Sequence, residues 1–435
     1  MEADVAAHQT PSPYRPGYNR RPPLLAGRDE ILALADEAVA IAAVDGGTPP
    51  ALLIVGPRGV GKSVLLGEIA ERAATSYGWP RLHVEVTPSV PFTPELVDGA
   101  RDLLARFDQA APGGLRVHEA TVGAAVGPLH GELHLARADP TATPNGALEL
   151  RRALTVAADA AMNRGGGFVL TIDEMQLTQG AELARLAAVL QHGIDLAWPV
   201  VMVGAGLAGM RDPERTVSYF ERADWYEIGA LTPAATLAAL RVPAQNSGRP
   251  IDDDAALLLA EASGGYPYAI QLYGHHAWRA SAGRSRIDKG AAQQAVQTGT
   301  VQLEHGLYAN RWTHATSAER HYLGALARLV ESRQSVRGAE VANELGVTTR
   351  QVAGVRDRLI KKGTITADGE LLTFVVPGMA NYIRTQEADS EPNRSGTALE
   401  ADGSRGPSAS AVPQTNEPIR WPRRMQSGPD FDLDL

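Results

Sequence analysis

Residues 51–63 constrain the fold of this chain more strongly than any other stretch. They read ALLIVGPRGVGKS: an apolar run enters a loop of the form G-x-x-x-x-G-K-S, and a helical pattern follows. Because glycine has no Cβ, such a loop can curl until its N–H groups point at phosphate oxygens, and the N-terminus of the next helix adds positive potential. The pattern therefore predicts a strand, a phosphate-binding loop (the P-loop) and a helix in direct succession.

We expect the P-loop to hold the phosphates of a nucleotide. Lys62 would reach the β- and γ-phosphates, and the Ser63 hydroxyl would bind Mg²⁺. The alternative is an accidental match on an ordinary strand-to-helix turn, and the complete Lys-Ser ending argues against it. The residues predicted to bind the phosphates are Gly56, Pro57, Arg58, Gly59, Val60, Gly61, Lys62, Ser63 and Val64.

A second apolar run, residues 167–174, ends in two carboxylates. Its sequence, GFVLTIDE, is typical of a buried strand, and the end of that strand would meet the P-loop in a parallel sheet. We expect Asp173 to bind Mg²⁺ through water and Glu174 to polarise the attacking water. A strand with an acidic turn would explain this run alone, but together with the P-loop it favours ATP hydrolysis over simple anion binding.

The composition excludes several kinds of chemistry. The 435 residues suffice for two or three domains, and the absence of cysteine excludes disulfides, thiolate zinc sites and thiol catalysis. No signal-peptide layout and no apolar stretch of membrane-spanning length occurs, so we expect a cytoplasmic protein without a membrane partner. The net charge of -9 does not indicate nucleic-acid binding over the whole surface, although it permits a local basic face.

Strand-like runs alternate with amphipathic helical segments over residues 23–231. The alternation is typical of an α/β fold, in which helices cover a parallel sheet. One additional run lies in the sequence between the P-loop strand and the acidic strand, as in the additional-strand type of P-loop NTPase. The predicted strands are residues 52–55, 82–86, 168–172, 200–203 and 226–231.

The remainder of the chain divides into four further segments. Residues 1–22 are rich in Pro and Arg and predict an extended arm, and residues 232–304 predict a small helical lid. Residues 305–385 have the layout of a winged helix-turn-helix, with two strand runs around an Asp-Gly hairpin signal. Residues 386–435 contain few aliphatic side chains and predict a disordered acidic tail. Residues 113–137 have no helical period, and we assign them no function.

With these pieces in this order, residues 23–384 resemble the AAA+/STAND P-loop ATPases, particularly the archaeal-type and origin-recognition-like group with a C-terminal winged helix. The resemblance implies ATP/ADP and Mg²⁺ as cofactors. In such proteins a segment like LLAGRDEI at 24–31 helps to enclose the adenine, which assigns Leu25, Gly27 and Arg28 to the nucleotide site. Gln176 resembles a polar residue that often follows the acidic pair.

Two positions depart from the family pattern. Gly204, Ala205 and Gly206 end the strand run where many AAA+ proteins have a polar sensor residue, so sensing of the γ-phosphate by that route is not expected. The lid carries Gly265-Tyr266-Pro267, which resembles the G-x-P motif of STAND proteins and not the arginine-bearing sensor of origin-recognition ATPases. This motif adds Pro267 to the predicted nucleotide site and favours a nucleotide-gated switch over a fast motor.

An arginine finger, which stabilises charge on the transferred phosphoryl group, is also expected from the resemblance. Arg222 in SYFERADW is the best-placed candidate, and Arg215 is the second. The alternative for each is an ordinary surface arginine on a helix.

Helical geometry along residues 349–362 predicts two different faces. Val352, Val355 and Leu359 fall on one arc that would pack on the preceding helix, whereas Gly354 and the basic residues fall on an outward arc. The outward residues could enter the major groove of double-stranded DNA, and the alternative is a solvated face on a winged helix that contacts only protein. The predicted DNA-binding residues are Arg350, Gln351, Arg358 and Lys361.

The sequence therefore favours an ATP-hydrolysing molecular switch whose winged helix binds DNA and passes the nucleotide state to a partner, within a nucleotide-dependent homo-oligomer or with a partner protein. One alternative is a signalling ATPase whose winged helix mediates only protein contacts. A small-molecule kinase is a second alternative, and the winged helix and the lack of an obvious acceptor site argue against it.

Overall fold

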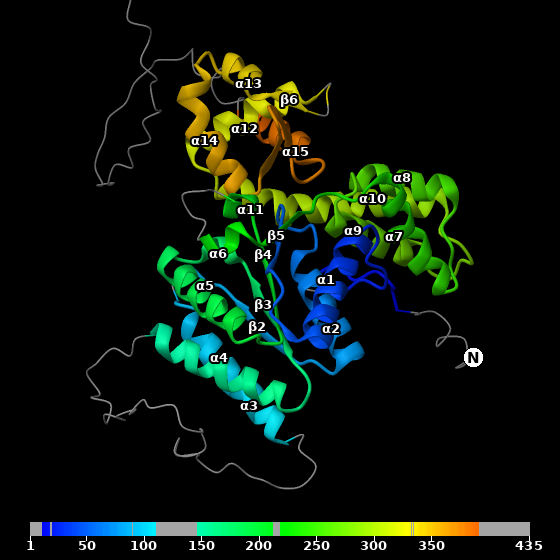
Figure 1. The fold of residues 1–435 in the computed structure, drawn as a ribbon. Helices are drawn as coiled ribbons and strands as arrows, with labels where there is room; N and C mark the ends of the chain where they lie inside the picture. The colour runs from blue at the N-terminus through cyan, green and yellow to red at the C-terminus, as the bar shows by residue number, and fades with distance from the viewer. Residues whose placement is uncertain are drawn as a thin grey trace, which may run out of the picture. The chain divides into compact units, whose positions relative to one another are not determined.

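Five parallel strands form the central sheet in the computed structural model, which describes residues 11–17, 20–88, 90–109, 146–211, 218–331, 333 and 335–390 (Figure 1). The strands are β1 (Leu52–Val55), β2 (Arg81–Glu85), β3 (Phe168–Asp173), β4 (Val200–Gly206) and β5 (Asp224–Glu227). They lie in the order β2-β3-β4-β1-β5, so β4 separates the P-loop strand β1 from the acidic strand β3. This α/β sheet confirms the predicted fold class.

The strand predicted at 226–231 is shifted. β5 begins at Asp224 and leaves the sheet after Glu227, because its neighbour β1 pairs with it only from Leu52 to Val55. Beyond Val55 the chain enters the P-loop and continues no strand with which β5 could pair. Ile228 makes one last hydrogen bond to the Val55 carbonyl, and the following residues lead into the lid.

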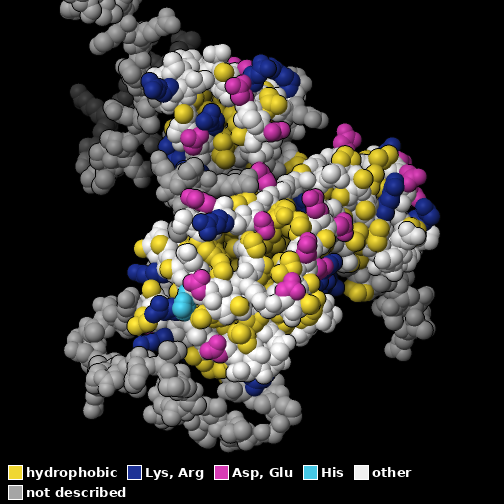
Figure 2. Space-filling view, in the orientation of Figure 1, with side chains coloured by type: hydrophobic (Ala, Val, Ile, Leu, Met, Phe, Trp, Pro, Cys, Tyr) yellow, Lys and Arg dark blue, Asp and Glu magenta, His cyan; other side chains and the backbone are white. Residues whose placement is uncertain are grey.

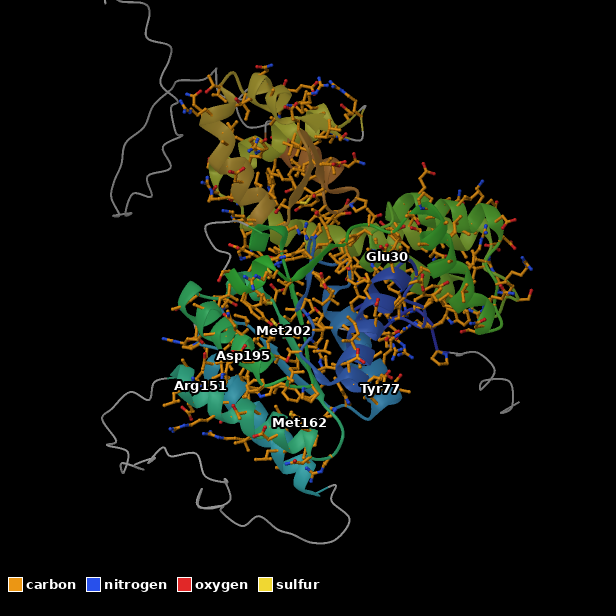
Figure 3. All side chains as sticks on the ribbon, viewed as in Figure 1. Glu30, Tyr77, Arg151, Met162, Asp195 and Met202 are labelled. Carbon is orange, nitrogen blue, oxygen red and sulfur yellow. The ribbon has the colours of Figure 1, made fainter. Side chains whose placement is uncertain are left out.

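Alternating side chains on the strands bury both faces of the sheet. Leu52 and Ile54 pack toward α1 (Asp29–Ile41) and α2 (Lys62–Tyr77), whereas Leu53 points to the opposite face. That opposite face is covered by α3 (Thr93–Gln109), α4 (Gly146–Met162) and α5 (Gly180–Asp195), and Met202 of β4 lies within its core (Figure 3). Burial on both faces explains why the strands read as continuous apolar runs.

Four helices follow the sheet, and we call them the lid helices. They are α7 (Pro233–Asn246), α8 (Asp253–Ser263), α9 (Pro267–Ala280) and α10 (Lys289–Leu303). The side chains of Thr232 and Asp288 cap α7 and α10 by accepting hydrogen bonds from the first helical turn, as expected for these residue types. These two helices thus begin where the sequence provides a capping oxygen.

The predicted N-terminal arm contains no helix or strand among its described residues, 11–17 and 20–22. These residues nevertheless pack on the rest of the protein. Tyr14 is buried, and its hydroxyl donates a hydrogen bond to the Leu240 carbonyl of α7. Its ring lies over Gly274 of α9, where a Cβ would come within 2.5 Å of the ring. Arg21 pairs with Glu68 and Glu71 of α2. The segment therefore joins the lid helices to the helix that follows the P-loop.

The chain continues through a π-helical segment (Glu304–Tyr308) and α11 (Ala309–Thr313) into the C-terminal region, α12 to α15. Its strands pair antiparallel in the order β6-β8-β7, and Gly369 has the positive φ that the Asp-Gly hairpin requires. This order of elements is consistent with a winged helix-turn-helix. The elements are α12 (Ser317–Leu329), β6 (Val336–Arg337), α13 (Gly338–Glu344), α14 (Thr349–Lys361), β7 (Ile365–Asp368), β8 (Leu371–Phe374) and α15 (Met379–Ser390).

The structure corrects the predicted start of the C-terminal tail and does not describe several other segments for which predictions were made. Because α15 runs to Ser390, the first five residues of the predicted disordered tail, 386–390, are helical. The rest of the tail, residues 113–137 and Arg215 lie outside the described residues. Within the described ranges, no helix is long and apolar enough to cross a membrane.

Candidate nucleotide site

The glycines of the P-loop have conformations or neighbours that other residues would not tolerate. Gly59 and Gly61 have φ values of 83° and 96°, in the left-handed region that favours glycine. A Cβ at Gly56 would lie 2.1 Å from the Ile228 carbonyl oxygen, because the loop passes directly over the end of β5. The loop therefore has the tight backbone course that a phosphate cradle requires.

Lys62 is the first residue of α2 and is held inside the loop. Its ammonium group donates to the carbonyl oxygens of Gly56 and Pro57, at 2.9 and 2.8 Å, and the side chain is only 7% exposed. Burial lowers the pKa of Lys62 to about 8, although the nearby carboxylates of Glu174 and Asp173 partly oppose this shift. The positive charge is thus already desolvated and needs an anionic partner.

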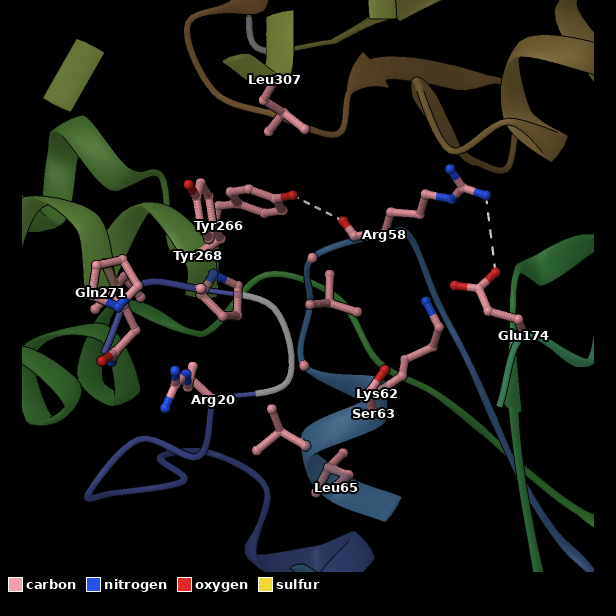
Figure 4. Close-up of a pocket in the computed structure, with 18 of the residues that line it drawn as sticks. Arg20, Arg58, Lys62, Ser63, Leu65, Glu174, Tyr266, Tyr268, Gln271 and Leu307 are labelled. Carbon is pink, nitrogen blue, oxygen red and sulfur yellow. Dashed lines mark hydrogen bonds and ion pairs between the residues drawn. The ribbon is translucent and has the colours of Figure 1, made fainter. Parts of the chain in front are cut away.

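The two predicted acidic residues lie at the end of β3, one buried and one at the cavity. Asp173 is buried and accepts a hydrogen bond from the Glu174 N–H at 2.8 Å. Glu174 has a φ of 54°, which is unusual for a residue other than glycine and is common at functional sites. Its carboxylate accepts from Gln176 and lies 3.9 Å from the Arg58 guanidinium, which reaches across from the P-loop (Figure 4). Glu174 is therefore held from two sides.

A cavity of about 990 Å³ opens beside these groups. It runs from the P-loop past the N-terminal segment and α9 to the first helices of the C-terminal region. Of the predicted residues, Gly27, Gly56, Pro57 and Asp173 do not line it, although Gly56 and Pro57 supply the carbonyls that hold Lys62. Those that line it are Leu25, Arg28, Arg58, Gly59, Val60, Gly61, Lys62, Ser63, Val64, Glu174 and Pro267.

Arg28 and Gly27, predicted to enclose the adenine, make structural contacts. The Arg28 guanidinium donates to the carbonyls of Gly229 and Val60, at 2.6 and 3.3 Å, and so ties the P-loop to the chain after β5. Gly27 has a φ of 65°, and a Cβ there would lie 2.9 Å from the Ala235 Cβ of α7. Of the segment 24–31, Gly27 allows the close approach of α7, and the residues that reach the cavity are Leu24, Leu25, Ala26 and Arg28.

The glycines at the end of β4 are explained by packing. A Cβ at Gly204 would lie 2.2 Å from the Met175 sulfur, and one at Gly206 would lie 2.0 Å from the Met210 sulfur. Gln176 accepts a hydrogen bond from the Leu207 N–H at 3.0 Å, which links the acidic strand to this end of β4. No space remains here for the polar sensor side chain that many relatives of this fold are expected to carry.

Several cavity residues were not identified from the sequence. The Tyr266 hydroxyl donates to the Arg58 carbonyl at 3.0 Å and lies where a Cβ of Gly59 would be, so α9 covers the P-loop (Figure 4). Arg20 and Gln271 lie at the opposite side of the cavity from Glu174. Arg311 of α11 also lines it. Tyr266 is the variable residue of the Gly265-Tyr266-Pro267 motif, which assigns it no role, and the other three positions belong to no recognisable motif. Only the approach of distant segments brings these residues together.

The predicted arginine finger and DNA-binding residues lie away from the P-loop. Arg222 follows α6 (Ser218–Glu221), is exposed and does not line the cavity of its own chain. On α14, Val352, Val355 and Leu359 are buried as predicted. The side chains of Arg350, Gln351, Arg358 and Lys361 are exposed.

Three of these α14 residues have additional contacts that the helical geometry did not predict. The Arg358 guanidinium lies 3.7 Å from the buried Glu319 carboxylate. The Gln351 amide oxygen accepts hydrogen bonds from the Thr348 N–H and hydroxyl, so it completes the N-terminal capping box of α14. The Lys361 stem lies beside Gly209, with its Cγ 3.3 Å from where a Cβ would be. Lys361 is therefore exposed, as its outward arc predicted, and its stem also packs beside the segment that follows β4.

Comparisons with known proteins agree with this fold. Residues 24–203 match the AAA ATPase domain, and residues 305–383 match a domain of unknown function, DUF8462. The chain is similar in fold to the Walker-type ATPase PABY2304 of Pyrococcus abyssi, with a TM-score of 0.57 and 14% identity over 83% of this chain and 96% of that chain. It is also similar to the Aeropyrum pernix ORC2 protein in its ADPNP-ADP complexes, with a TM-score of 0.53 and 14% identity over 86% of this chain and 98% of that chain.

A comparison with curated proteins gives no match. The match to the AAA ATPase domain includes both the P-loop and the acidic pair of β3. Together with the shared fold, it supports an AAA+ P-loop ATPase that binds nucleotide.

Proposed function

We propose that this protein is a molecular switch that binds ATP at the P-loop, hydrolyses it slowly and passes the nucleotide state to its C-terminal region. The observation that carries the proposal is the convergence of Lys62, Ser63 and the acidic pair from two segments that β4 separates in the sheet, β1–α2 and β3. Lys62 is close enough to Asp173 and Glu174 for both carboxylates to act on its pKa. A cation, a hydroxyl and two carboxylates beside a glycine-rich loop suit a magnesium-bound triphosphate.

Each group has a distinct role in this proposal. Lys62 binds phosphate oxygens in place of the Gly56 and Pro57 carbonyls. The Ser63 hydroxyl, and the Asp173 carboxylate through water, would hold Mg²⁺, which would supply charge neutralisation for the phosphates. Glu174 orients the attacking water once Arg58 moves away from it. The contacts of Glu174 with Arg58 and Gln176 fit an enzyme whose general base is restrained before nucleotide binding, and hence one with slow turnover.

Two substitutions test the chemistry. Glu174→Gln should retain ATP binding and lose most hydrolysis, because it removes the base and leaves the phosphate cradle intact. Lys62→Ala should lose nucleotide affinity itself. Glu71→Gln is a matched control, since Glu71 is an exposed carboxylate on α2 outside the cavity. Equal turnover of wild type and Glu174→Gln, measured by phosphate release, would refute the assignment of the base.

The switch needs a physical connection to the C-terminal region, and Gly363 supports one. This residue follows α14, and a Cβ placed on it would lie 3.5 Å from the Arg58 backbone nitrogen. The tip of the P-loop thus touches the turn after α14. A conformational change of the P-loop on nucleotide binding would displace this turn directly.

We further propose that the winged helix-turn-helix binds double-stranded DNA through the exposed arginines of α14. The upper part of Figure 2 shows Lys and Arg side chains interspersed with Asp and Glu on the visible face of this region. Arg350 and Arg358 are exposed, and beyond the backbone of α14 itself the Arg358 side chain is the only described group within 4 Å of where a Cβ of Gly354 would be. A DNA backbone could therefore approach Gly354 closely.

DNA retention with and without ATP, at stated salt concentrations, tests this part of the proposal. Replacing both Arg350 and Arg358 with Ala should weaken DNA binding and flatten its salt dependence, while ATP hydrolysis is unchanged. Replacing both Arg151 and Arg152 with Ala, two exposed arginines of α4, serves as the charge-matched control. If wild type shows no affinity for DNA at low salt in either nucleotide state, the alternative of a signalling ATPase with only protein partners is favoured.

A further inference from the structure

Arg311 is a partly buried arginine at the nucleotide cavity, and one of its terminal nitrogens makes no hydrogen bond of normal geometry. It lies on α11, which connects the lid helices to the C-terminal region, and it lines the same cavity as the P-loop. One terminal nitrogen, Nη1, donates to the Gly363 carbonyl at 3.0 Å. The other, Nη2, is buried and makes no hydrogen bond of normal geometry among the described residues, although the nearby Tyr266 hydroxyl acts on the guanidinium. The sequence analysis gave this arginine no role.

A buried, unpaired N–H on a charged group indicates a missing acceptor. Arginine stays charged at physiological pH, so it cannot relieve its burial by losing the proton. Burial acts to lower the pKa of Arg311, Tyr266 opposes this effect, and the neighbouring charge of Arg58 adds to it. A second positive charge beside an incompletely paired guanidinium favours an anion as the absent partner.

The position of Arg311 specifies which anion. Gly363, its bonding partner, lies against the Arg58 backbone, and Tyr266 lies over Gly59. Arg311 is therefore at the Arg58 end of the P-loop, from which the Arg58 side chain reaches Glu174 (Figure 4). In the proposed reaction Glu174 orients water toward the terminal phosphate, so the γ-phosphate belongs at this end.

We propose that Arg311 donates through Nη2 to the γ-phosphate of bound ATP and, through Nη1, holds the turn at Gly363. ADP lacks the γ-phosphate that would accept this hydrogen bond. Only with ATP would the Arg311 guanidinium connect the nucleotide in the P-loop to the turn after α14. This inference rests on the proposed nucleotide-binding function and adds the residue that distinguishes the two nucleotides. It places γ-phosphate recognition in the helix before the C-terminal region, whereas the end of β4 has only Gly204, Ala205 and Gly206.

Calorimetric titration with AMP-PNP and with ADP, each with Mg²⁺, tests the proposal on the full-length protein. Arg311→Gln should weaken AMP-PNP binding by about 10-fold or more, the value for one hydrogen bond to a charged group, and change ADP binding less than about 2-fold. Arg311→Lys, which keeps the charge, should show a smaller loss. Arg320→Gln is the matched control, because Arg320 donates to the carbonyls of Trp312 and Thr313 and does not line the cavity.

The outcomes separate this inference from the proposal on which it rests. If wild type binds both nucleotides and Arg311→Gln loses neither, or loses both equally, the assignment of Arg311 is overturned while the nucleotide site stands. If wild type binds neither nucleotide, both proposals fail. Should Arg311→Gln not fold, hydrogen exchange of residues 362–365 in wild type decides: slower exchange with AMP-PNP than with ADP supports the link, and equal exchange overturns it.

Discussion

The buried ammonium group of Lys62 should make the stability of this protein depend on pH in a specific way. Its pKa is about 8 in the folded chain, against an ordinary value of 10.5. Between these two values the unfolded chain binds the proton and the folded chain does not, so the free energy of unfolding rises with pH. Below pH 8 both states bind the proton, and the folded state bears the full cost of burying the charge.

The size of this effect follows from the shift. At about 1.4 kcal/mol for each pKa unit, the difference between 10.5 and about 8 corresponds to about 3 kcal/mol. Lys62 is only 7% exposed, so solvent screening reduces this value little. Over the range from pH 8 to 9.5, in which most proteins stay folded, wild type should gain about 2 kcal/mol relative to a variant that lacks the group.

Urea unfolding of wild type and Lys62→Met across this pH range measures the effect. Methionine has a similar length and no charge, and the loss of the hydrogen bonds to Gly56 and Pro57 shifts stability equally at every pH. The difference between the two proteins therefore reports the titration of Lys62 alone. Parallel stability curves, or a difference that falls as pH rises, would refute the claim that the ammonium group is desolvated in the loop.

Two further substitutions examine the contacts around the site. Tyr14→Ala should destabilise the protein by about 3–5 kcal/mol in urea unfolding, because the buried ring that packs on Gly274 is removed. Tyr14→Phe should cost about 1 kcal/mol, the value of the hydrogen bond to Leu240. A loss below about 1 kcal/mol for Tyr14→Ala would show that the N-terminal segment is not anchored. Arg222→Ala should lower ATP hydrolysis and leave binding intact if a neighbouring subunit contributes the finger. Normal turnover in that variant, with a protein that remains monomeric in ATP by light scattering, would contradict this role.

Local patterns were enough to predict the elements that carry the nucleotide chemistry. The glycine spacing of residues 56–63 predicted a curled loop at the start of a helix, and Gly59 and Gly61 have the left-handed conformations that it requires. The apolar run that ends in Asp173 predicted β3, and helical spacing predicted the buried positions of Val352, Val355 and Leu359. Each prediction depends on neighbours within one turn of helix or one strand, where steric and hydrophobic preferences act directly.

Only the tertiary structure decided which distant residues meet at the cavity. Tyr266 and Arg311 reach the P-loop from segments more than two hundred residues away, and the stem of the exposed Lys361 lies beside Gly209. A periodic pattern determines which face of an element is buried, but it does not determine which element covers that face, because packing selects the partner by shape and charge over the whole fold. The arginine proposed to recognise the γ-phosphate was therefore identifiable only from its buried, unpaired nitrogen in the folded chain.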